Sequence, residues 1–220
     1  MLQFAFANGR EASYHILCLG AHSDDIEIGC GGTMLRLAQE YPNLSVTWVV
    51  FSANELRAKE ASASANAFLA NAGEKTVIVR DFRDGYFPYV GAEIKNYFEQ
   101  LKQEQSPDLI FTHYRADLHQ DHSCISDLTW NTFRNHLILE YEIQKYDGDL
   151  GAPNVFVPQE AAISQLKISH LLAHFKSQKD KHWFTADAFT ALMRLRGIEC
   201  GSPTGYAEAF HGRKLVLMAP

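Results

Sequence analysis

Two short clusters of histidine and acidic residues are the parts of this chain best suited to chemistry. The first is Ala21-His22-Ser23-Asp24-Asp25, and the second is Asp-Leu-His-Gln-Asp-His at positions 117–122. Catalytic zinc sites commonly use two imidazoles and one carboxylate, with a fourth position left for water. We therefore predict one zinc ion per chain, held by His22, Asp25 and His122.

Hydrolysis at such a site also needs groups that move protons and stabilise charge. Asp24 lies beside a predicted ligand without having to bind the metal, so we predict that it is the general base. His119 is predicted to donate to the oxygen on which negative charge develops. Asp121 is expected to accept the second N–H of a ligand imidazole, and Glu27 to brace the loop through a backbone donor or a basic group.

Each of these residues also has a plainer interpretation when it is taken alone. Asp24, Asp25 and Asp121 are residue types that cap helices, and helices are expected to follow both clusters. The set is harder to explain in this way. Three acidic and two imidazole groups at two strand ends would repel one another or stay unpaired unless something organised them, and this favours the metal site.

The elements that must position the two clusters alternate between strand and helix. Such alternation predicts an α/β fold with a mostly parallel sheet and helices on both faces. Both clusters directly follow predicted strands, so they should meet at the carboxyl edge of the sheet. The expected strands are 14–20, 45–52, 76–80, 108–112, 137–143 and 214–218. One expected helix starts at 34, and the others cover 55–71, 92–105, 122–135, 159–176 and 185–194.

Three further segments carry predictions. The glycines within 29–33 are expected to form a loop that lets the backbone approach substrate or pack against the sheet. Residues 145–158 are rich in glycine, proline and aspartate, and are expected to form a surface loop or a lid. His211 would reach the site and donate to an oxygen of the substrate if the last strand returns to the sheet.

Composition limits the classes of protein that fit. A chain of 220 residues suits a single domain over 1–220, and its four scattered cysteines favour a reducing cytoplasm. No signal peptide or apolar run long enough to span a membrane is expected from the sequence. The net charge of −6 argues against a nucleic-acid partner, so we expect a small-molecule substrate.

The two clusters resemble the motifs of the LmbE/PIG-L family of zinc-dependent N-acetylglucosaminyl de-N-acetylases. The family's Ala-His-Pro-Asp-Asp motif, with its Glu and Gly-x-Gly-Gly-Thr continuation, corresponds to 21–33, and its His-x-Asp-His motif corresponds to 119–122. The resemblance covers most of the chain, up to a closing Glu-x-Phe segment at 208–210. One departure is Ser23, which stands where the family has proline.

The resemblance implies a Rossmann-like, LmbE-like fold and the same ligands, base and donor as above. It further implies that Arg57, in an Arg-x-x-Glu segment, reaches the substrate and that Asp84, in Asp-Gly, accepts from sugar hydroxyls. The implied reaction is removal of the N-acetyl group from an amino sugar or its conjugate, such as a nucleotide-linked sugar, by attack of water on the amide. Assembly into a homo-oligomer is compatible with the family.

Two rival functions stay open at the level of sequence. The same zinc site would suit hydrolysis of another bond such as a phosphoester, although two-metal phosphatases need more ligands than the chain offers. A protein that binds a sugar conjugate without turning it over is the other rival. The presence of both a base and an oxyanion donor favours the deacetylase.

Overall fold

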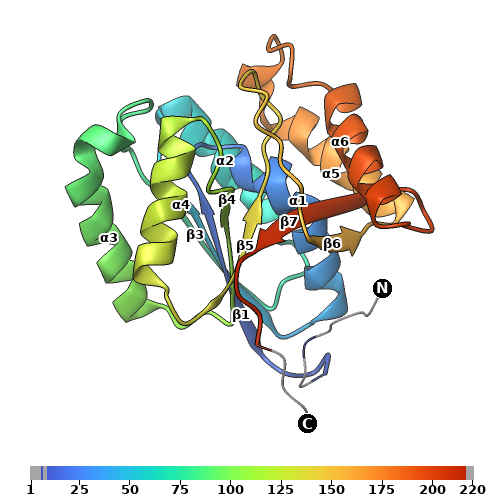
Figure 1. Cartoon of the computed structure of the whole chain (residues 1–220), viewed down its shortest axis with the longest axis horizontal. Coiled ribbons are helices and arrows are strands. Elements are labelled where there is room, and N and C mark those ends of the chain that lie inside the picture. The colour runs from blue at the N-terminus through green and yellow to red at the C-terminus, as the bar shows by residue number, and fades with distance from the viewer. Residues whose placement is uncertain (1–5, 7–8, 217–220) are drawn as a thin grey trace.

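The computed structural model describes residue 6 and residues 9–216, and these form one mixed β-sheet flanked by helices (Figure 1). Within the described residues the sheet has seven strands in the order β3-β2-β1-β4-β5-β7-β6. The strands are β1 Tyr14–Gly20, β2 Leu44–Val50, β3 Glu74–Val79, β4 Leu109–His113, β5 Leu137–Tyr141, β6 Val155–Pro158 and β7 Ala207–Gly212. The helices are α1 Asp25–Glu40, α2 Glu55–Phe68, α3 Gly91–Glu104, α4 Gln120–Thr132, α5 Ala161–His174 and α6 Ala186–Glu199, with short 3₁₀ turns η1 Phe87–Val90 and η2 Lys176–Gln178.

The order of the strands explains where a site can form. Strands β1 to β5 pair in parallel, and β7 pairs antiparallel with both β5 and β6. The chain winds outward from β1 through β2 to β3, and then returns to the other side of β1 as β4. The loops that follow β1 and β4 therefore diverge at a topological switch point, where open α/β sheets bind ligands.

Helices cover both faces of the sheet, as the sequence predicted. On one face α1, α2, α5 and α6 pack over a core that includes Trp48 and Phe111, and on the other α3 and α4 pack over Leu17 and Phe51 (Figure 1). The buried parallel strands are nearly continuous apolar runs because both of their faces meet helices. This arrangement confirms the mostly parallel α/β fold.

The glycine-rich segment after β1 was wrongly predicted to be a loop. Helix α1 begins at Asp25 and runs through Gly29, Gly31 and Gly32. A Cβ at Gly29 would lie 2.2 Å from the Tyr141 ring, and a Cβ at Gly31 would lie 2.6 Å from Phe68. The glycines are therefore needed for close packing of this helix against the sheet and α2, rather than for a flexible loop.

The last strand was also predicted in the wrong place. It is β7, at Ala207–Gly212, whereas residues 214–216 form no strand and 217–218 lie outside the described residues. The predicted loop 145–158 contains β6 at its end, which adds the strand at the edge of the sheet beside β7. The other predicted strands and helices are present, with ends shifted by a few residues.

Along the described part of the chain, we find no helix with the length and hydropathy that a bilayer crossing requires.

Candidate metal centre

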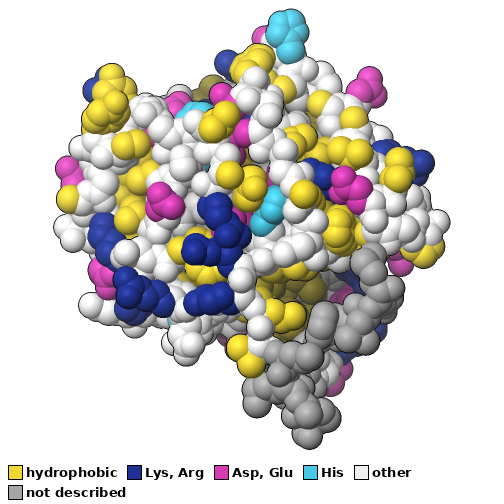
Figure 2. All heavy atoms as spheres, in the orientation of Figure 1, with side chains coloured by type: hydrophobic (Ala, Val, Ile, Leu, Met, Phe, Trp, Pro, Cys, Tyr) yellow, Lys and Arg dark blue, Asp and Glu magenta, His cyan; other side chains and the backbone are white. Residues whose placement is uncertain are grey.

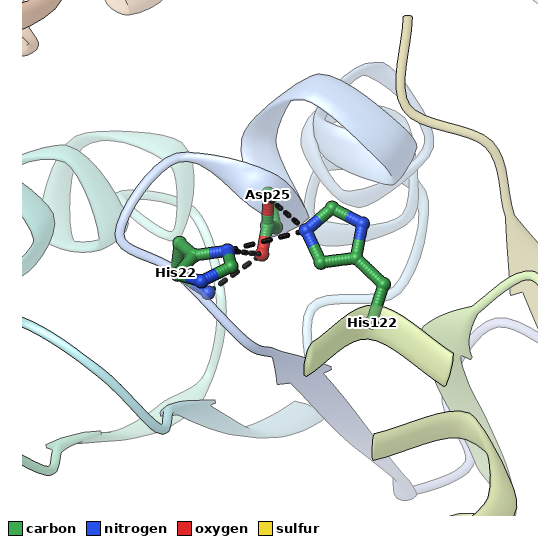
Figure 3. Close-up of side chains that lie close together, drawn as sticks. All are labelled: His22, Asp25 and His122. Atoms are coloured by element: carbon green, nitrogen blue, oxygen red, sulfur yellow. Dashed lines mark hydrogen bonds and ion pairs between the residues drawn. The ribbon is translucent and has the colours of Figure 1, made fainter. Parts of the chain in front are cut away.

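The three predicted ligands lie together at the carboxyl edge of the sheet (Figure 3). His22 comes from the turn after β1, Asp25 from the first residue of α1, and His122 from the first turn of α4. His22 Nδ1 lies 3.1 Å from His122 Nε2 and 3.4 Å from Asp25 Oδ2, and His122 Nε2 lies 3.6 Å from Asp25 Oδ1. Chain segments a hundred residues apart thus deliver one compact group of donor atoms.

The spacing of these donor atoms fits a small divalent metal. Ligands about 2.0–2.1 Å from a tetrahedral zinc ion stand about 3.3 Å from one another, which is close to the separations observed. His22 and Asp25 are largely buried and His122 is 3% exposed, so neither imidazole can satisfy its inward nitrogen with bulk water. The chemistry and spacing of this donor set therefore fit a metal that accepts two nitrogens and a carboxylate oxygen.

The charges of the cluster also favour a metal ion. Burial alone would lower the pKa of His22, but the carboxylates of Asp121, Asp25 and Asp84 outweigh it and raise that pKa well above its ordinary value. Burial and the neighbouring His113 lower the pKa of His122 to about 4. One proton on His22 therefore faces a neutral His122, and a metal cation would replace that proton.

Carboxylates hold both ligand imidazoles from behind. Asp121 Oδ2 lies 3.3 Å from His22 Nε2, and the same side chain accepts the backbone N–H groups of Gly85 and Phe87. Asp117 Oδ2 lies 2.9 Å from Nδ1 of His122. The sequence predicted this kind of support from Asp121, but it did not assign the same role to Asp117.

Asp117 and His113 are the site residues that the sequence reasoning missed. Asp117 opens the second cluster, five residues before His122, so its position was a usable signal. His113 is the last residue of β4 and is fully buried; its ring stacks on His122 with centroids 3.9 Å apart, and its Nε2 accepts the Ala21 N–H. This packing restricts the orientation of the His122 ring.

The predicted base, Asp24, lies beside the ligands and is paired with Arg57. Arg57 Nη2 lies 2.6 Å from Asp24 Oδ1, while Asp24 Oδ2 is buried and has no partner among the described residues. Burial raises the pKa of Asp24 even though the Arg57 charge opposes this shift. One oxygen is thus fixed by the arginine, and the other remains available for a proton.

His119 lies at the start of α4, beside both ligand imidazoles. It caps that helix, because its Nδ1 accepts the backbone N–H of Asp121 at 3.2 Å. Its ring lies 4.5 Å from the ring of His122 and 5.0 Å from that of His22. With Nδ1 acting as an acceptor, the neutral ring carries its proton on Nε2, which leaves that nitrogen as a donor.

A pocket of about 230 Å³ opens beside His22, and its wall includes Arg57, Arg83 and Asp84. Asp84 has a side chain that is 70% exposed, and its Oδ1 lies 3.1 Å from His22 Nε2. The hydrogen bond from His22 lowers the pKa of Asp84, so this carboxylate is charged where the pocket meets solvent. Two of the three positions predicted for substrate contact, Arg57 and Asp84, therefore line the same cavity.

Glu27 is not placed as expected. It is fully buried in the first turn of α1, and among the described residues no basic group pairs with its carboxylate. Burial raises its pKa well above the ordinary value, so Glu27 does not brace a loop as an ion. Ser23, at the position of the family proline, is also buried, and its hydroxyl makes no hydrogen bond within the described structure.

His211 lies in β7 and does not join the predicted ligands. Its ring stacks on Tyr114 with centroids 3.8 Å apart, and its Nε2 lies 3.3 Å from Glu142 Oε1. β7 pairs with β5, so β4 and β5 both separate it from β1. The return of the chain to the sheet, on which the prediction depended, therefore places this histidine at a different part of the edge.

The structure is therefore that of an α/β protein with a candidate metal centre at the switch point of its sheet, and comparison with known proteins gives the family. The family model for PIG-L, described as GlcNAc-PI de-N-acetylase, matches residues 17–133, which is more than half of the chain. The matched region contains both clusters. The chain belongs to the PIG-L family, a family of metal-dependent N-deacetylases.

Solved structures share the fold over nearly the whole chain. The conserved protein TT1542 from Thermus thermophilus is 24% identical with a TM-score of 0.72, covering 94% of this chain and 98% of its own. The N,N'-diacetylchitobiose deacetylase from Pyrococcus horikoshii is 22% identical with a TM-score of 0.72, covering 96% and 87%. The 4-carboxy-2-hydroxymuconate hydratase GalB from Pseudomonas putida KT2440 is 14% identical with a TM-score of 0.70, covering 94% and 99%. At these identities the likeness establishes the fold, and a fold alone does not determine the reaction.

Proposed function

We propose that this protein is a zinc-dependent hydrolase that removes the N-acetyl group from an N-acetylated amino sugar conjugate. The observation that carries the proposal is the convergence of His22, Asp25 and His122 beside Asp24 and His119, in a chain of the PIG-L family. The donor set has two nitrogens and one carboxylate oxygen, which suits zinc in a catalytic site. When bound, zinc would polarise the acetyl carbonyl and make water a stronger nucleophile.

Asp24 is proposed to move the proton. Its unpartnered Oδ2 would take a proton from the attacking water as the new C–O bond forms. The same carboxyl group would then give that proton to the amide nitrogen as the C–N bond breaks, because an amide anion is a very poor leaving group. The products are acetate and the free amine of the sugar. Arg57 would hold Asp24 in place through its hydrogen bond to Oδ1.

His119 is proposed to stabilise the oxygen on which negative charge develops. Its Nδ1 is already occupied by the Asp121 N–H, so Nε2–H is the donor that can be aimed at the acetyl oxygen. Removal of one such donor commonly costs about 10²–10³ in kcat. Because Nδ1 is fixed by the helix backbone, the ring needs little reorganisation when the charge appears.

The surroundings of the pocket favour a conjugate over a free monosaccharide. Polar walls from Arg57, Arg83 and Asp84 suit the hydroxyls of a sugar, and Arg57 Nε is buried without a partner among the described residues. Large apolar side chains are also exposed on segments that follow the parallel strands, and Figure 2 shows hydrophobic side chains exposed at the upper edge of the molecule. They are Leu56, Tyr86, Tyr89, Leu118, Tyr146 and Leu150.

The names of related proteins agree with this substrate class. The family is named for a glycolipid-linked N-acetylglucosamine, and one structural neighbour is named for N,N'-diacetylchitobiose. Arg83, which stacks on Tyr86 at 3.5 Å, would also suit an anionic group such as the phosphate of a nucleotide-linked sugar. The chemical nature of the group attached to the sugar is thus the main variable for an assay.

The test is acetate release by the zinc-loaded protein from N-acetylated sugars that are free, lipid-linked, aryl-linked or nucleotide-linked. Asp24→Asn should retain zinc and lose about 10²–10⁴ in kcat. Asp127→Asn, an exposed carboxylate on α4, is the matched control and should behave as the wild type. Full activity of Asp24→Asn would remove Asp24 from the mechanism, and zinc-loaded protein that binds conjugates without releasing acetate would support the binding-protein alternative.

A further inference from the structure

The segment 144–151, which follows β5, folds back over the turn that carries the second cluster. We call this segment the strap. Its Lys145 has a side chain that is only 9% exposed, and its Nζ lies 3.0 Å from Asp117 Oδ1 and 2.5 Å from Asp149 Oδ2. A lysine buried between two carboxylates is uncommon on a surface loop, because burial of a charge is costly unless the charge is paired.

Asp117 connects this lysine to both histidines of the second cluster. Its Oδ2 forms a hydrogen bond with Nδ1 of His122 at 2.9 Å. Its Oδ1 accepts a hydrogen bond from the backbone N–H of His119 at 2.8 Å and also pairs with Lys145. The Asp117 carboxylate therefore holds two groups in place. One is the His122 imidazole, which faces the metal position, and the other is the backbone of His119, the proposed oxyanion donor. The lysine holds the carboxylate in the orientation that serves both.

Asp149 secures the same turn from the other end of the strap. Its Oδ2 accepts the backbone N–H of Leu118 at 2.7 Å as well as the bond from Lys145. Beyond it, the Gly151 N–H donates to Glu142 Oε1 at 2.7 Å, so the strap is anchored to β5's end of the sheet. The backbone N–H groups of Leu118 and His119 are thus both held by carboxylates that share Lys145.

The strap therefore differs from a lid that opens freely. Tyr146, at its tip, is 72% exposed, whereas the side chains of Lys145 and Asp149 are enclosed against the turn. Lifting the strap would separate Lys145 from Asp117 and leave a buried carboxylate with one fewer partner beside His122. A group that orients a ligand imidazole commonly changes metal affinity 10–100-fold when it is removed.

We propose that Lys145 is a positioning residue which, through Asp117, sets the orientation of His122 toward a bound metal and of His119 toward the reacting oxygen. It touches neither the metal position nor the substrate pocket. The part of this inference that concerns His119 rests on the proposed function, whereas the part that concerns His122 needs only metal binding.

The experiment compares the full-length wild type with Lys145→Met, Lys145→Arg and a control, Lys95→Met. Lys95, on α3, pairs with Glu99 and donates to Thr132, which is the last residue of α4, whereas His122 lies in the first turn of that helix. The zinc Kd is measured by competition with a chromophoric chelator, and the downfield imidazole N–H signals of the zinc-loaded protein are recorded by NMR. We expect Lys145→Met to raise the zinc Kd about 10-fold and to shift or broaden the His122 Nδ1–H signal, with Lys145→Arg within about threefold of the wild type and Lys95→Met unchanged.

Kinetics with an active conjugate add a further readout. Lys145→Met should lower kcat while KM stays within about twofold, since the pocket walls are intact. A zinc Kd within about twofold of the wild type together with an unchanged His122 signal would overturn the proposal. If Lys145→Met does not fold, Asp149→Asn tests the same link, with a zinc Kd raised about threefold as the supporting result and an unchanged Kd as the contrary one. Failure of the proposed deacetylation would appear as absent acetate release in the wild type, and the zinc and NMR results would still decide the role of Lys145.

Discussion

Two buried polar clusters of this protein use similar residues and do different things. In the first, Glu208 accepts from Gly32 N, Thr33 N, Thr33 Oγ1 and Lys167 Nζ at 2.6–2.8 Å, and Lys167 also donates to Ile28 O. Both oxygens of Glu208 therefore meet donors from the protein. In the second, the inward nitrogens of His22 and His122 face each other and the carboxylate of Asp25.

The two clusters differ in whether the protein itself supplies partners for their polar atoms. The cluster of Lys167 and Glu208 joins β7, α5 and α1, and it is closed by its own hydrogen bonds. The ligand cluster gathers atoms that can accept a cation and holds them from behind with Asp117 and Asp121. A buried polar group that is fully paired stabilises the fold. Several buried atoms that can all bind a cation and that point at one another indicate a ligand site.

The strongest test of this comparison is to replace one buried histidine inside the ligand cluster and one buried histidine that the protein itself pairs. His122→Gln should weaken zinc binding more than about 100-fold, because even outer-shell changes cost 10–100-fold, and acetate release should be lost with the metal. His211→Gln, in a buried ring outside the ligand cluster, should keep the zinc Kd within about twofold. Zinc stoichiometry and Kd, measured on both variants, decide the matter, and equal losses in the two would mean that His211 belongs to the site.

A smaller effect is expected on stability when the closed cluster is opened. Glu208→Gln leaves the charge of Lys167 buried without a counter-ion, which should lower the free energy of unfolding by about 3–5 kcal/mol. The zinc Kd of the folded protein should stay near that of the wild type, because Glu208 touches none of the three ligands. Urea unfolding in the presence of chelator and a separate zinc titration measure the two quantities. Unchanged stability with weakened zinc binding would reverse the roles we assign to the two clusters.

The general fold and the grouping of the three predicted ligands were predictable from the sequence, because the strands are local apolar patterns and both clusters directly follow strands. Buried parallel strands are apolar runs, and the residues that follow β1 and β4 must meet at the switch point of the sheet. This was enough to bring His22, Asp25 and His122 together. The predicted ends of the helices were less accurate where packing overrides helix propensity. In α1, Gly29 and Gly31 are helical because Tyr141 and Phe68 lie against them.

The supporting contacts were less predictable because they depend on the paths of loops and on strand order. Nothing local connects Lys145 with Asp117, since the two meet only when the strap folds back across the turn. The pairing of Arg57 with Asp24 likewise depends on how α2 packs beside α1. His211 was expected at the site because the order of β4, β5 and β7 cannot be read from the apolar pattern of the last strand.

The smallest effect that we predict concerns pH and a third cluster, in which Glu142 pairs with Arg196 and His211. Burial disfavours the charged form of Glu142, but hydrogen bonds from His211 and the Gly151 N–H, with the Arg196 charge, outweigh it and lower the pKa of Glu142. A carboxylate whose pKa is lower in the folded state stabilises the protein above its unfolded pKa of about 4.3. That stabilisation is lost as the pH falls through the folded pKa.

Glu142→Gln isolates this contribution from those of the other carboxylates. At pH 7 the variant should be less stable by about 2 kcal/mol, the scale of a hydrogen-bonded charged group. The difference between wild type and variant should begin to shrink as the pH falls below the unfolded pKa of about 4.3, and it should be lost only as the pH falls through the lower folded pKa, where Glu142 becomes protonated in the folded wild type. Urea unfolding of the metal-free proteins across this pH range measures the difference, and a constant value would mean that Glu142 acts through packing alone. A shrinking difference would mean that Glu142, like Glu208, is a buried charge whose partners are supplied by the fold. The cluster of His22, Asp25 and His122 would then differ from both, because its atoms need a cation as their partner.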